Sequence, residues 1–410
     1  MTKLLLPALT FDPASAPDLD WDGPASFILA NPEWVRRAPD AAATAPARLP
    51  ELPAHFWIAT SGSTTADPAH VLWVGLSKTA VLASAAAVNA HLEASASDTW
   101  GHALPIFHAG GLGILARARL CGAKVVAAVE RRWDAWRFRE RLVEAGVTLT
   151  ALVPSQVHDL VSARLHPPAS LRAAVVGGAR LDPELYREAR ALGWPCLPSY
   201  GLTETASQVA TATIGSLGSR AYPVVLPLLP HAAARPGDDG RLELRASSLL
   251  TCYAEMAGGE VRVWDPKIDG WFATEDIGAV HRDGIEVLGR ASDSVKVLGE
   301  LVSLGRVEAQ ARRWVEAEPL LRDLRADLAV VAPSHPRLGH ELVLVLAHPD
   351  TPARQPLDLA ALQQSLDRFT RDALLPFERV RRILLTARIP RTALGKCQRQ
   401  LLLREVGLEA

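Results

Sequence analysis

The stretch LRAAVVGGARLDPELYREARALGWPCLPSYGLTE, residues 171–204, decides the fold class. An apolar run ends in two glycines, a helix-like segment covers Pro183 to Leu192, and a second apolar run leads to Tyr200. Continuous apolar strands separated by helices are typical of a parallel sheet covered on both faces. Ligands of such sheets gather beyond the carboxyl ends of the strands, so the loops after these strands are candidate sites.

The same alternation extends toward the N-terminus. The apolar runs FWIAT, KVVAAV and TLTALVP are each followed by a helix-like stretch, which predicts a mostly parallel, helix-covered sheet from Phe56 to about Pro198. The expected helices cover Ser77 to Leu92, Trp133 to Ala145 and Gln156 to Ala163. From Gly218 to Leu288, short alternating runs such as RLELRAS and GIEVLG predict a smaller antiparallel β region.

The length of 410 residues favours more than one domain. We predict an α/β protein with a large N-terminal domain, residues 1–288, and a small α+β C-terminal domain, residues 289–410. The strands DLAVVAP and ELVLVLAHP and helical stretches around Val307 to Ala317 and Asp358 to Leu374 belong to the second domain. The first 50 residues, rich in Ala and Pro, are expected to form a loosely structured arm.

Composition restricts the partners. A net charge of -1 gives no electrostatic reason to bind a polyanion, so we expect no nucleic-acid partner. The four cysteines are widely separated and lack zinc-site spacing. The apolar run near the N-terminus is too short for a signal peptide, and no run of about 18 apolar residues predicts a membrane span. A cytoplasmic protein is expected, and an oligomer is compatible with the sequence.

Two loops carry groups suited to a nucleotide. Thr60-Ser61-Gly62-Ser63-Thr64 follows the strand FWIA, and its hydroxyl groups and backbone N–H groups suit phosphate oxygens, although such a run alone is more often a solvated loop. Tyr200-Gly201-Leu202-Thr203-Glu204 offers an aromatic face, a hydroxyl and a carboxylate, and Glu204 suits Mg²⁺. The alternative for this second motif is a helix start capped by Thr203.

Three later segments add weaker signals. In the segment Gly270 to Asp276, acidic residues follow an aromatic pair, and a carboxylate there could accept hydrogen bonds from ribose hydroxyls. Taken alone, the segment indicates a β-turn. Arg290, after Gly289, could meet ribose or phosphate, whereas a lone linker arginine is usually solvated. In Ile389 to Lys396, a lysine on a Gly-containing loop can place a point charge against developing phosphate charge.

Taken in this order, the five segments resemble the adenylate-forming superfamily of acyl-CoA synthetases, luciferases and peptide-synthetase adenylation domains, over Phe56 to Arg399. Within it, LPIFHAGGLGILARARLCGAKVV (104–126), ALVPSQVHDLV (151–161) and VVGGARLDPELYREARALGWPCLPSYGLTETAS (175–207) are most similar to o-succinylbenzoate–CoA ligases of menaquinone synthesis. The resemblance implies that a substrate carboxylate reacts with ATP and Mg²⁺ to give an acyl-adenylate and pyrophosphate, and that coenzyme A then forms the thioester.

The resemblance also implies site residues. Their roles would be phosphate binding (Thr60, Ser61, Gly62, Ser63, Thr64), adenine binding (Gly177, Gly178, Ala179, Tyr200, Gly201), phosphate and Mg²⁺ binding (Thr203, Glu204), ribose binding (Asp276, Arg290), catalysis of adenylation (Lys396), and contact with the acyl group or the thiol arm (His108, Gly299). The small domain would rotate about Gly289 to Asp293 between the two half-reactions.

Two positions depart from the family pattern. The phosphate loop continues as Thr65 to His70 and lacks the usual lysine, for which His70 or Lys78 could substitute. Ser292 replaces the usual hinge aspartate. We expect slower or specialised catalysis rather than an inactive protein. The alternatives are a ligase for another acid or for a carrier-protein thiol, and a non-catalytic nucleotide-binding relative. The sequence leaves open which of Ser155, Arg180 and Gln208 touches the acid.

Overall fold

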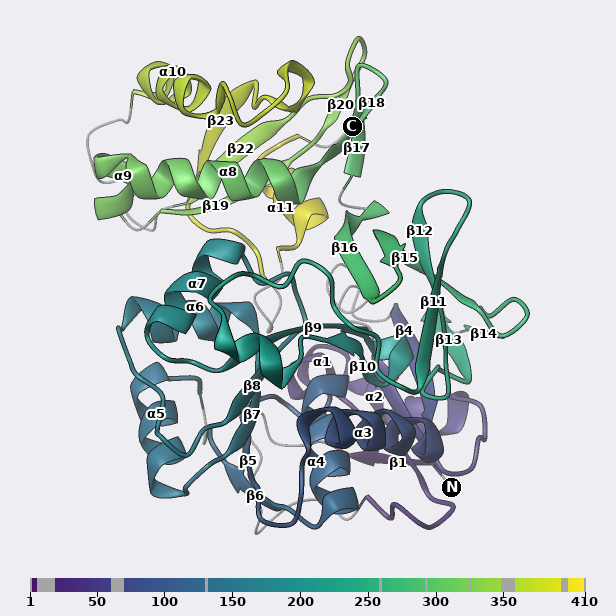
Figure 1. The fold of residues 1–410 in the computed structure, drawn as a ribbon. Coiled ribbons are helices and arrows are strands. Elements are labelled where there is room, and N and C mark those ends of the chain that lie inside the picture. The colour runs from purple at the N-terminus through teal and green to yellow at the C-terminus, as the bar shows by residue number, and fades with distance from the viewer. Residues whose placement is uncertain are drawn as a thin grey trace. The chain divides into compact units, whose positions relative to one another are not determined.

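The computed structural model describes residues 2–5, 19–59, 70–129, 132–257, 260–291, 294–324, 326–347, 358–391 and 397–408 (Figure 1). The chain divides into two compact units. Unit 1 holds residues 1–274 and 278–287, and unit 2 holds residues 275–277 and 288–410. A mobile C-terminal domain that begins at residue 289 stays a prediction.

Unit 1 begins with a six-stranded mixed sheet in the order β1-β2-β3-β4-β13-β14. β1, β2 and β3 are parallel, whereas β4 pairs antiparallel with both β3 and β13. The strand FWIA therefore lies in this mixed sheet and not in the parallel sheet predicted for it, because β3 pairs with β2 and β4. The strands are β1 (Thr2–Leu5), β2 (Ser26–Leu29), β3 (His55–Ala59), β4 (Val71–Ser77), β13 (Cys252–Ala257) and β14 (Glu260–Trp264).

The expectation of a loosely structured arm is wrong for residues 19–50. This segment forms β2 and two helices, α1 (Pro32–Arg37) and α2 (Pro39–Arg48), each with proline in its first turn, where a missing N–H costs no hydrogen bond. Trp34 of α1 packs edge-on against Trp73 of β4 at 5.3 Å between ring centroids. Ala- and Pro-rich composition thus concealed two short helices that cover one face of the first sheet.

The second sheet of unit 1 has the order β10-β9-β8-β7-β5-β6, and all its strands except β10 are parallel. Helices α5, α6 and α7 cover one face. Helices α3 and α4 lie between the two sheets and contribute apolar side chains to the core that faces β2, β3 and β4 (Figure 1). The predicted alternation of strands and helices is confirmed here. The elements are α3 (Lys78–Leu92), β5 (Thr99–His102), α4 (Ala109–Cys121), β6 (Lys124–Ala127), α5 (Ala135–Glu144), β7 (Leu149–Leu152), α6 (Pro154–Ser162), β8 (Ala173–Val176), α7 (Pro183–Ala191), β9 (Cys196–Leu202) and β10 (Ser207–Thr211).

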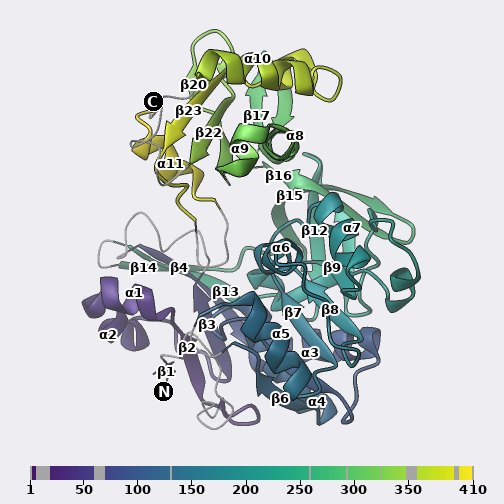
Figure 2. The ribbon, with the colours of Figure 1, turned by 90° about the vertical axis from the view of Figure 1, so that its left-hand side faces the viewer.

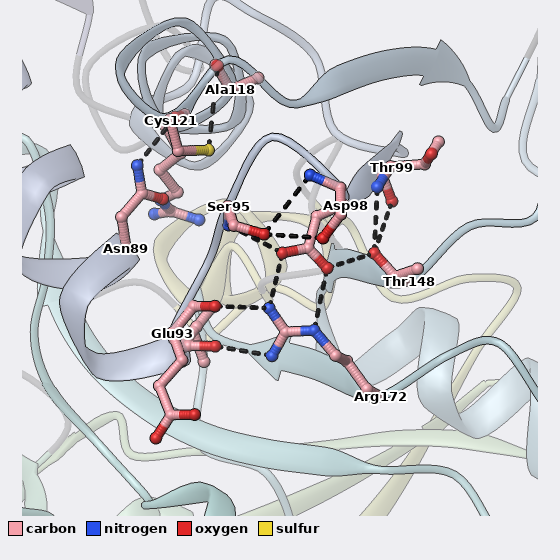
Figure 3. A network of polar contacts seen from close by, with 12 residues as sticks. Asn89, Glu93, Ser95, Asp98, Thr99, Ala118, Cys121, Thr148 and Arg172 are labelled. Atoms are coloured by element: carbon pink, nitrogen blue, oxygen red, sulfur yellow. Dashed lines mark hydrogen bonds and ion pairs between the residues drawn. The ribbon is translucent and has the colours of Figure 1, made fainter.

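A polar network fastens the amino ends of the parallel strands (Figure 3). Asp98, just before β5, accepts hydrogen bonds from Nε and Nη2 of Arg172 (2.9 and 2.8 Å) and from the Thr148 hydroxyl (2.7 Å). Although burial acts to raise the pKa of Asp98, these hydrogen bonds lower it to about 2. Arg172 also donates to the Leu92 carbonyl at the end of α3 (2.6 Å). The opposite, carboxyl edge of the sheet carries the predicted site.

A smaller sheet has the order β11-β12-β15-β16, with β11 and β12 antiparallel, and accounts for most of the predicted β region. Its strands are β11 (Ala232–Pro236), β12 (Arg241–Ala246), β15 (Phe272–His281) and β16 (Gly284–Arg290), and the last two contribute residues to both units.

Unit 2 has its own core. The sheet β19-β22-β23 is covered on one face by α8 and α10 and on the other by α11 (Figure 2). A second small sheet has the order β18-β17-β21-β20. In the described part of the chain, no helix is long and apolar enough to cross a membrane. The elements are β17 (Ser294–Val297), β18 (Glu300–Ser303), α8 (Leu304–Ala317), α9 (Pro319–Asp323), β19 (Asp327–Val331), β20 (Ser334–His335), β21 (Gly339–His340), β22 (Val343–Ala347), α10 (Leu359–Thr370), β23 (Arg382–Thr386) and α11 (Arg399–Glu405).

Candidate active site

The central motif is a tight hairpin in which β9 leads into a 3₁₀ turn, Thr203–Thr205, and returns as β10. Gly201 pairs with Gln208, and a Cβ atom at Gly201 would lie 2.1 Å from the Ser207 carbonyl oxygen. Only glycine therefore permits this approach of the two strands.

The tip of the hairpin is held by Thr205. Its hydroxyl accepts a hydrogen bond from the Leu202 N–H (2.9 Å) and donates to the Ser207 carbonyl (2.6 Å), and Ala206 takes a left-handed conformation with φ of 58°. The alternative of a helix capped by Thr203 is wrong, because the chain makes a single turn that Thr205 caps. Thr203 and Glu204 lie half-buried at the tip.

The Glu204 carboxylate is oriented from a distant part of the sequence. The Tyr253 hydroxyl donates to its Oε1 (2.8 Å), and the Leu250 N–H donates to its backbone carbonyl (2.7 Å). No residue in the described ranges hydrogen-bonds to Oε2 in the structure. An oxygen left in this way fits Mg²⁺, which prefers few carboxylate ligands together with phosphate oxygens and water. The motif itself did not indicate Tyr253.

The predicted adenine-binding glycines lie beside this hairpin. Gly177, Gly178 and Ala179 follow β8, which runs parallel to β9, and the Ser199 hydroxyl donates to the Val176 carbonyl (2.9 Å). Gly178 has φ of 81°, a conformation that favours glycine. The two motifs are thus brought together at the carboxyl edge of one sheet.

Helix α4 begins next to His108. Its Nε2 atom is buried and has no hydrogen-bond partner in the described part of the chain, and its ring lies 4.7 Å from that of Phe107. Burial lowers the pKa of His108 to about 4, so the imidazole is neutral near pH 7. An unsatisfied neutral nitrogen is suited to a polar group of a ligand rather than to a fixed anion.

Arg117, further along α4, is a functional candidate that the sequence motifs did not indicate. The side chain is 1% exposed, and its Nη2 donates to the Ser207 hydroxyl (2.8 Å) and the Gln208 side-chain oxygen (2.9 Å). Its Nε and Nη1 atoms have no hydrogen-bond partner in the described ranges, and burial lowers its pKa to about 10. A buried cation with only neutral partners calls for an anion. By contrast Arg180, one of the three residues that the sequence left open for the acid, is exposed.

Unit 2 carries the predicted ribose-binding pair and the predicted thiol-arm glycine. Arg290 Nε lies 3.1 Å from Oδ1 of the buried Asp276, so these two residues are brought together. Gly299, with φ of 88°, and Leu298, with φ of 55°, form the turn between β17 and β18. Such a two-residue turn needs positive φ at both positions.

The remaining predicted residues lie outside the described ones: Thr60, Ser61, Gly62, Ser63, Thr64 and Lys396, together with Ser292 and Asp293 at the expected hinge. Of the two possible substitutes for the missing lysine, Lys78 is 3% exposed and donates to the carbonyls of Asp20 and Gly23. Because the phosphate loop lies outside the described residues, a role for Lys78 there stays a prediction. His70 is exposed and lies 2.8 Å from the Glu255 carboxylate.

The sequence of unit 1 matches a known protein family. The AMP-binding enzyme family matches residues 20–246. The chain belongs to the AMP-binding enzyme family. The match spans the first sheet, the parallel sheet and the hairpin of Glu204, so the resemblance inferred from the ordered motifs is confirmed.

Relatives within the AMP-binding enzymes carry a common name. The chain is 31% identical over 350 residues to the 2-succinylbenzoate–CoA ligase of Escherichia coli, covering 84% of this chain and 68% of that protein. It is 32% identical over 221 residues to the enzyme of that name from Bacillus licheniformis, covering 52% of this chain and 45% of that protein. The chain thus spans less than half the length of the second relative.

Solved structures give the same fold. An E. coli MenE variant with bound OSB-AMS has a TM-score of 0.63 and 26% identity, covering 85% of this chain and 68% of that one. The Bacillus subtilis o-succinylbenzoate CoA synthetase in complex with the acyl-adenylate OSB-AMP has a TM-score of 0.73 and 20% identity, covering 98% and 87%. The predicted adenylate-forming fold is confirmed.

Proposed function

We propose that this protein is an ATP-dependent carboxylate–CoA ligase that works through an acyl-adenylate, with o-succinylbenzoate as its acid. A carboxylate oxygen attacks the α-phosphorus of ATP and pyrophosphate leaves. The thiol sulfur of coenzyme A then attacks the acyl carbon and AMP leaves. Family membership, the named relatives and the Glu204 hairpin support this reaction type.

Arg117 is the observation that carries the choice of acid. o-Succinylbenzoate has two carboxylates, of which one is activated and the other keeps its charge. Burying that second charge is unfavourable unless a cation and hydrogen bonds meet it. The two guanidinium nitrogens of Arg117 that lack partners in the described ranges are suited to this contact, with Ser207 and Gln208 fixing the third.

The proposal assigns the other roles as the motifs suggest. Thr60, Ser61, Gly62, Ser63 and Thr64 would bind phosphates, and Gly177, Gly178, Ala179, Tyr200 and Gly201 the adenine. Thr203 and Glu204 would hold the phosphate and Mg²⁺, which offsets phosphate charge, and Asp276 and Arg290 would hold the ribose. Lys396 would assist adenylation, and His108 and Gly299 would line the path of the acyl group and the thiol. A cytoplasmic location and small-molecule partners remain expectations.

The test is product detection by mass spectrometry after incubation with ATP, Mg²⁺, coenzyme A and o-succinylbenzoate. We expect succinylbenzoyl-CoA from the natural protein and a loss of at least about 100-fold in Lys396→Ala, since removing one charge-stabilising donor has effects of this size. A panel of other acids, read by pyrophosphate release, separates a different ligase. ATP binding without turnover of any acid would favour the non-catalytic relative instead.

A further inference from the structure

We propose that Tyr253 is a positioning residue that sets the orientation of the Glu204 carboxylate for Mg²⁺. The inference rests on the proposed function, because it takes Glu204 as the protein's ligand to the Mg²⁺ that accompanies ATP. Tyr253 holds one carboxylate oxygen and leaves the other for the ion.

The geometry assigns the two oxygens different partners. The Tyr253 hydroxyl lies 2.8 Å from Glu204 Oε1 across 49 positions of sequence, a distance typical of a hydroxyl that donates to a carboxylate. A phenol has one proton to donate, so the Tyr253 hydroxyl engages a single oxygen of the carboxylate. Oε2 has no hydrogen-bond partner in the described ranges and is the oxygen directed to the ion.

The direction of the phenol is fixed by the first sheet. Tyr253 lies on β13 opposite Val74 of β4 and Trp264 of β14, and its ring lies 5.2 Å from that of Trp264. Flanked by two strands, the ring has little freedom to follow Glu204 if the turn shifts. The hydroxyl therefore acts as a fixed point for the carboxylate.

The segment just before Tyr253 holds the backbone of Glu204 as well. The Leu250 N–H donates to the Glu204 carbonyl (2.7 Å), and the Leu250 carbonyl accepts from the Lys267 ammonium (2.7 Å). The Thr251 N–H donates to the Gly75 carbonyl (2.7 Å), and the Thr251 hydroxyl meets His55 Nε2 at 2.8 Å. Backbone and side chain of Glu204 are thus both tied to one anchored segment, which is what positioning requires.

The experiment uses Tyr253→Phe, which removes one oxygen atom and keeps the ring against Trp264. ATP binding to the full-length protein is measured by calorimetry over a series of Mg²⁺ concentrations. Hydrogen bonds to charged groups are stronger than those between neutral groups. We therefore expect the loss of this bond to raise the half-saturating Mg²⁺ concentration about 10-fold. Tyr222→Phe is the matched control, since Tyr222 contacts the ring of Tyr186 and belongs to no part of the proposed site; it should leave the Mg²⁺ dependence unchanged.

A double-mutant comparison separates positioning from a general structural effect. Adding Tyr253→Phe to Glu204→Gln should change ATP binding no further, because the phenol acts through Glu204. If Tyr253→Phe does not fold, Tyr253→His, which retains a ring donor, is measured instead and should give a smaller shift. The same Mg²⁺ dependence in Tyr253→Phe as in the natural protein overturns the positioning role and leaves the ligase proposal intact. Failure of the natural protein to bind ATP with Mg²⁺ overturns both.

Discussion

His102, at the carboxyl end of β5, makes the stability of the fold depend on pH. The ring is 1% exposed, its Nε2 lies 3.1 Å from the Gly111 carbonyl, and burial lowers the pKa of His102 to about 4. The unfolded chain binds a proton near pH 6.5 and the folded protein does not until about pH 4, so stability is full above pH 6.5 and falls as the pH drops between these values.

We predict that His102 alone lowers the free energy of unfolding by about 2 kcal/mol between pH 7 and pH 5. Urea unfolding of the natural protein and of His102→Gln at both pH values is the measurement. The glutamine side chain keeps a donor for Gly111 but has no charge to gain, so the pH dependence of the variant should be smaller by this amount. An equal dependence in both proteins would contradict the prediction.

Arg117→Met tests the buried cation. We expect kcat/KM for o-succinylbenzoate to fall about 100-fold, since leaving a buried charge without its partner costs several kcal/mol. The melting temperature should hold or rise, because a well-packed apolar side chain often replaces a buried charge without loss. Arg119→Met is the matched control two positions away, with a side chain that is 40% exposed and paired with Asp22. If kcat/KM falls by the same factor with monocarboxylic acids, the assigned contact between Arg117 and the second carboxylate is contradicted.

Local motifs predicted the residues at the hairpin tip, but not those that reach it from elsewhere. Glu204 and Tyr200 stand in one short run after a recognisable strand. Tyr253 reaches Glu204 only because β13 pairs with β4, and this long-range pairing leaves no periodic signal in the sequence. Arg117 is a charged residue in a mostly apolar helix, which is a possible signal of function. Arg119 lies in the same helix and is exposed, so the sequence alone did not distinguish the two arginines.

At the scale of elements, the turn between β17 and β18 stores strain. Leu298 has φ of 55° and is 54% exposed, a conformation that disfavours leucine and favours asparagine before glycine. We predict that Leu298→Asn raises the free energy of unfolding by about 1 kcal/mol, the lower end of the cost of such strain. Thermal unfolding measures this, and Gly299→Ala, which adds a side chain at φ of 88°, should destabilise.

Strands and helices with a local signal were predicted, and those without one were missed. Each apolar run between β6 and β9 is short and continuous, and the helices between them repeat their apolar residues at helical spacing. The helices α1 and α2 begin at prolines inside an Ala-rich stretch, so composition concealed them. The antiparallel return of β4 was missed because an apolar run alone does not give the direction of its neighbour.

At the scale of the whole molecule, the order of the motifs carried more information than any one of them. The sequence showed that Asp276, Arg290 and Lys396 come after the segment that forms the Glu204 hairpin. It did not show that Asp276 groups with the second unit, which it does because residues 275–277 pack with residue 288 and those beyond it. The order of residues along the chain does not show which segments pack together. Here the second unit includes part of β15 and part of β16, which are separated by residues of the first unit.

The two-unit organisation leads to a prediction about the two half-reactions. If the second unit presents Lys396 only for adenylation, Lys396→Ala should slow pyrophosphate release with o-succinylbenzoate by at least about 100-fold. The same variant, supplied with preformed acyl-adenylate and coenzyme A, should form the thioester within about 3-fold of the natural rate, because that step develops no charge on pyrophosphate. Tyr222→Phe serves as the control for both steps. An equal loss in both half-reactions would show that Lys396 supports the site as a whole, and that the second unit does not exchange faces between the steps.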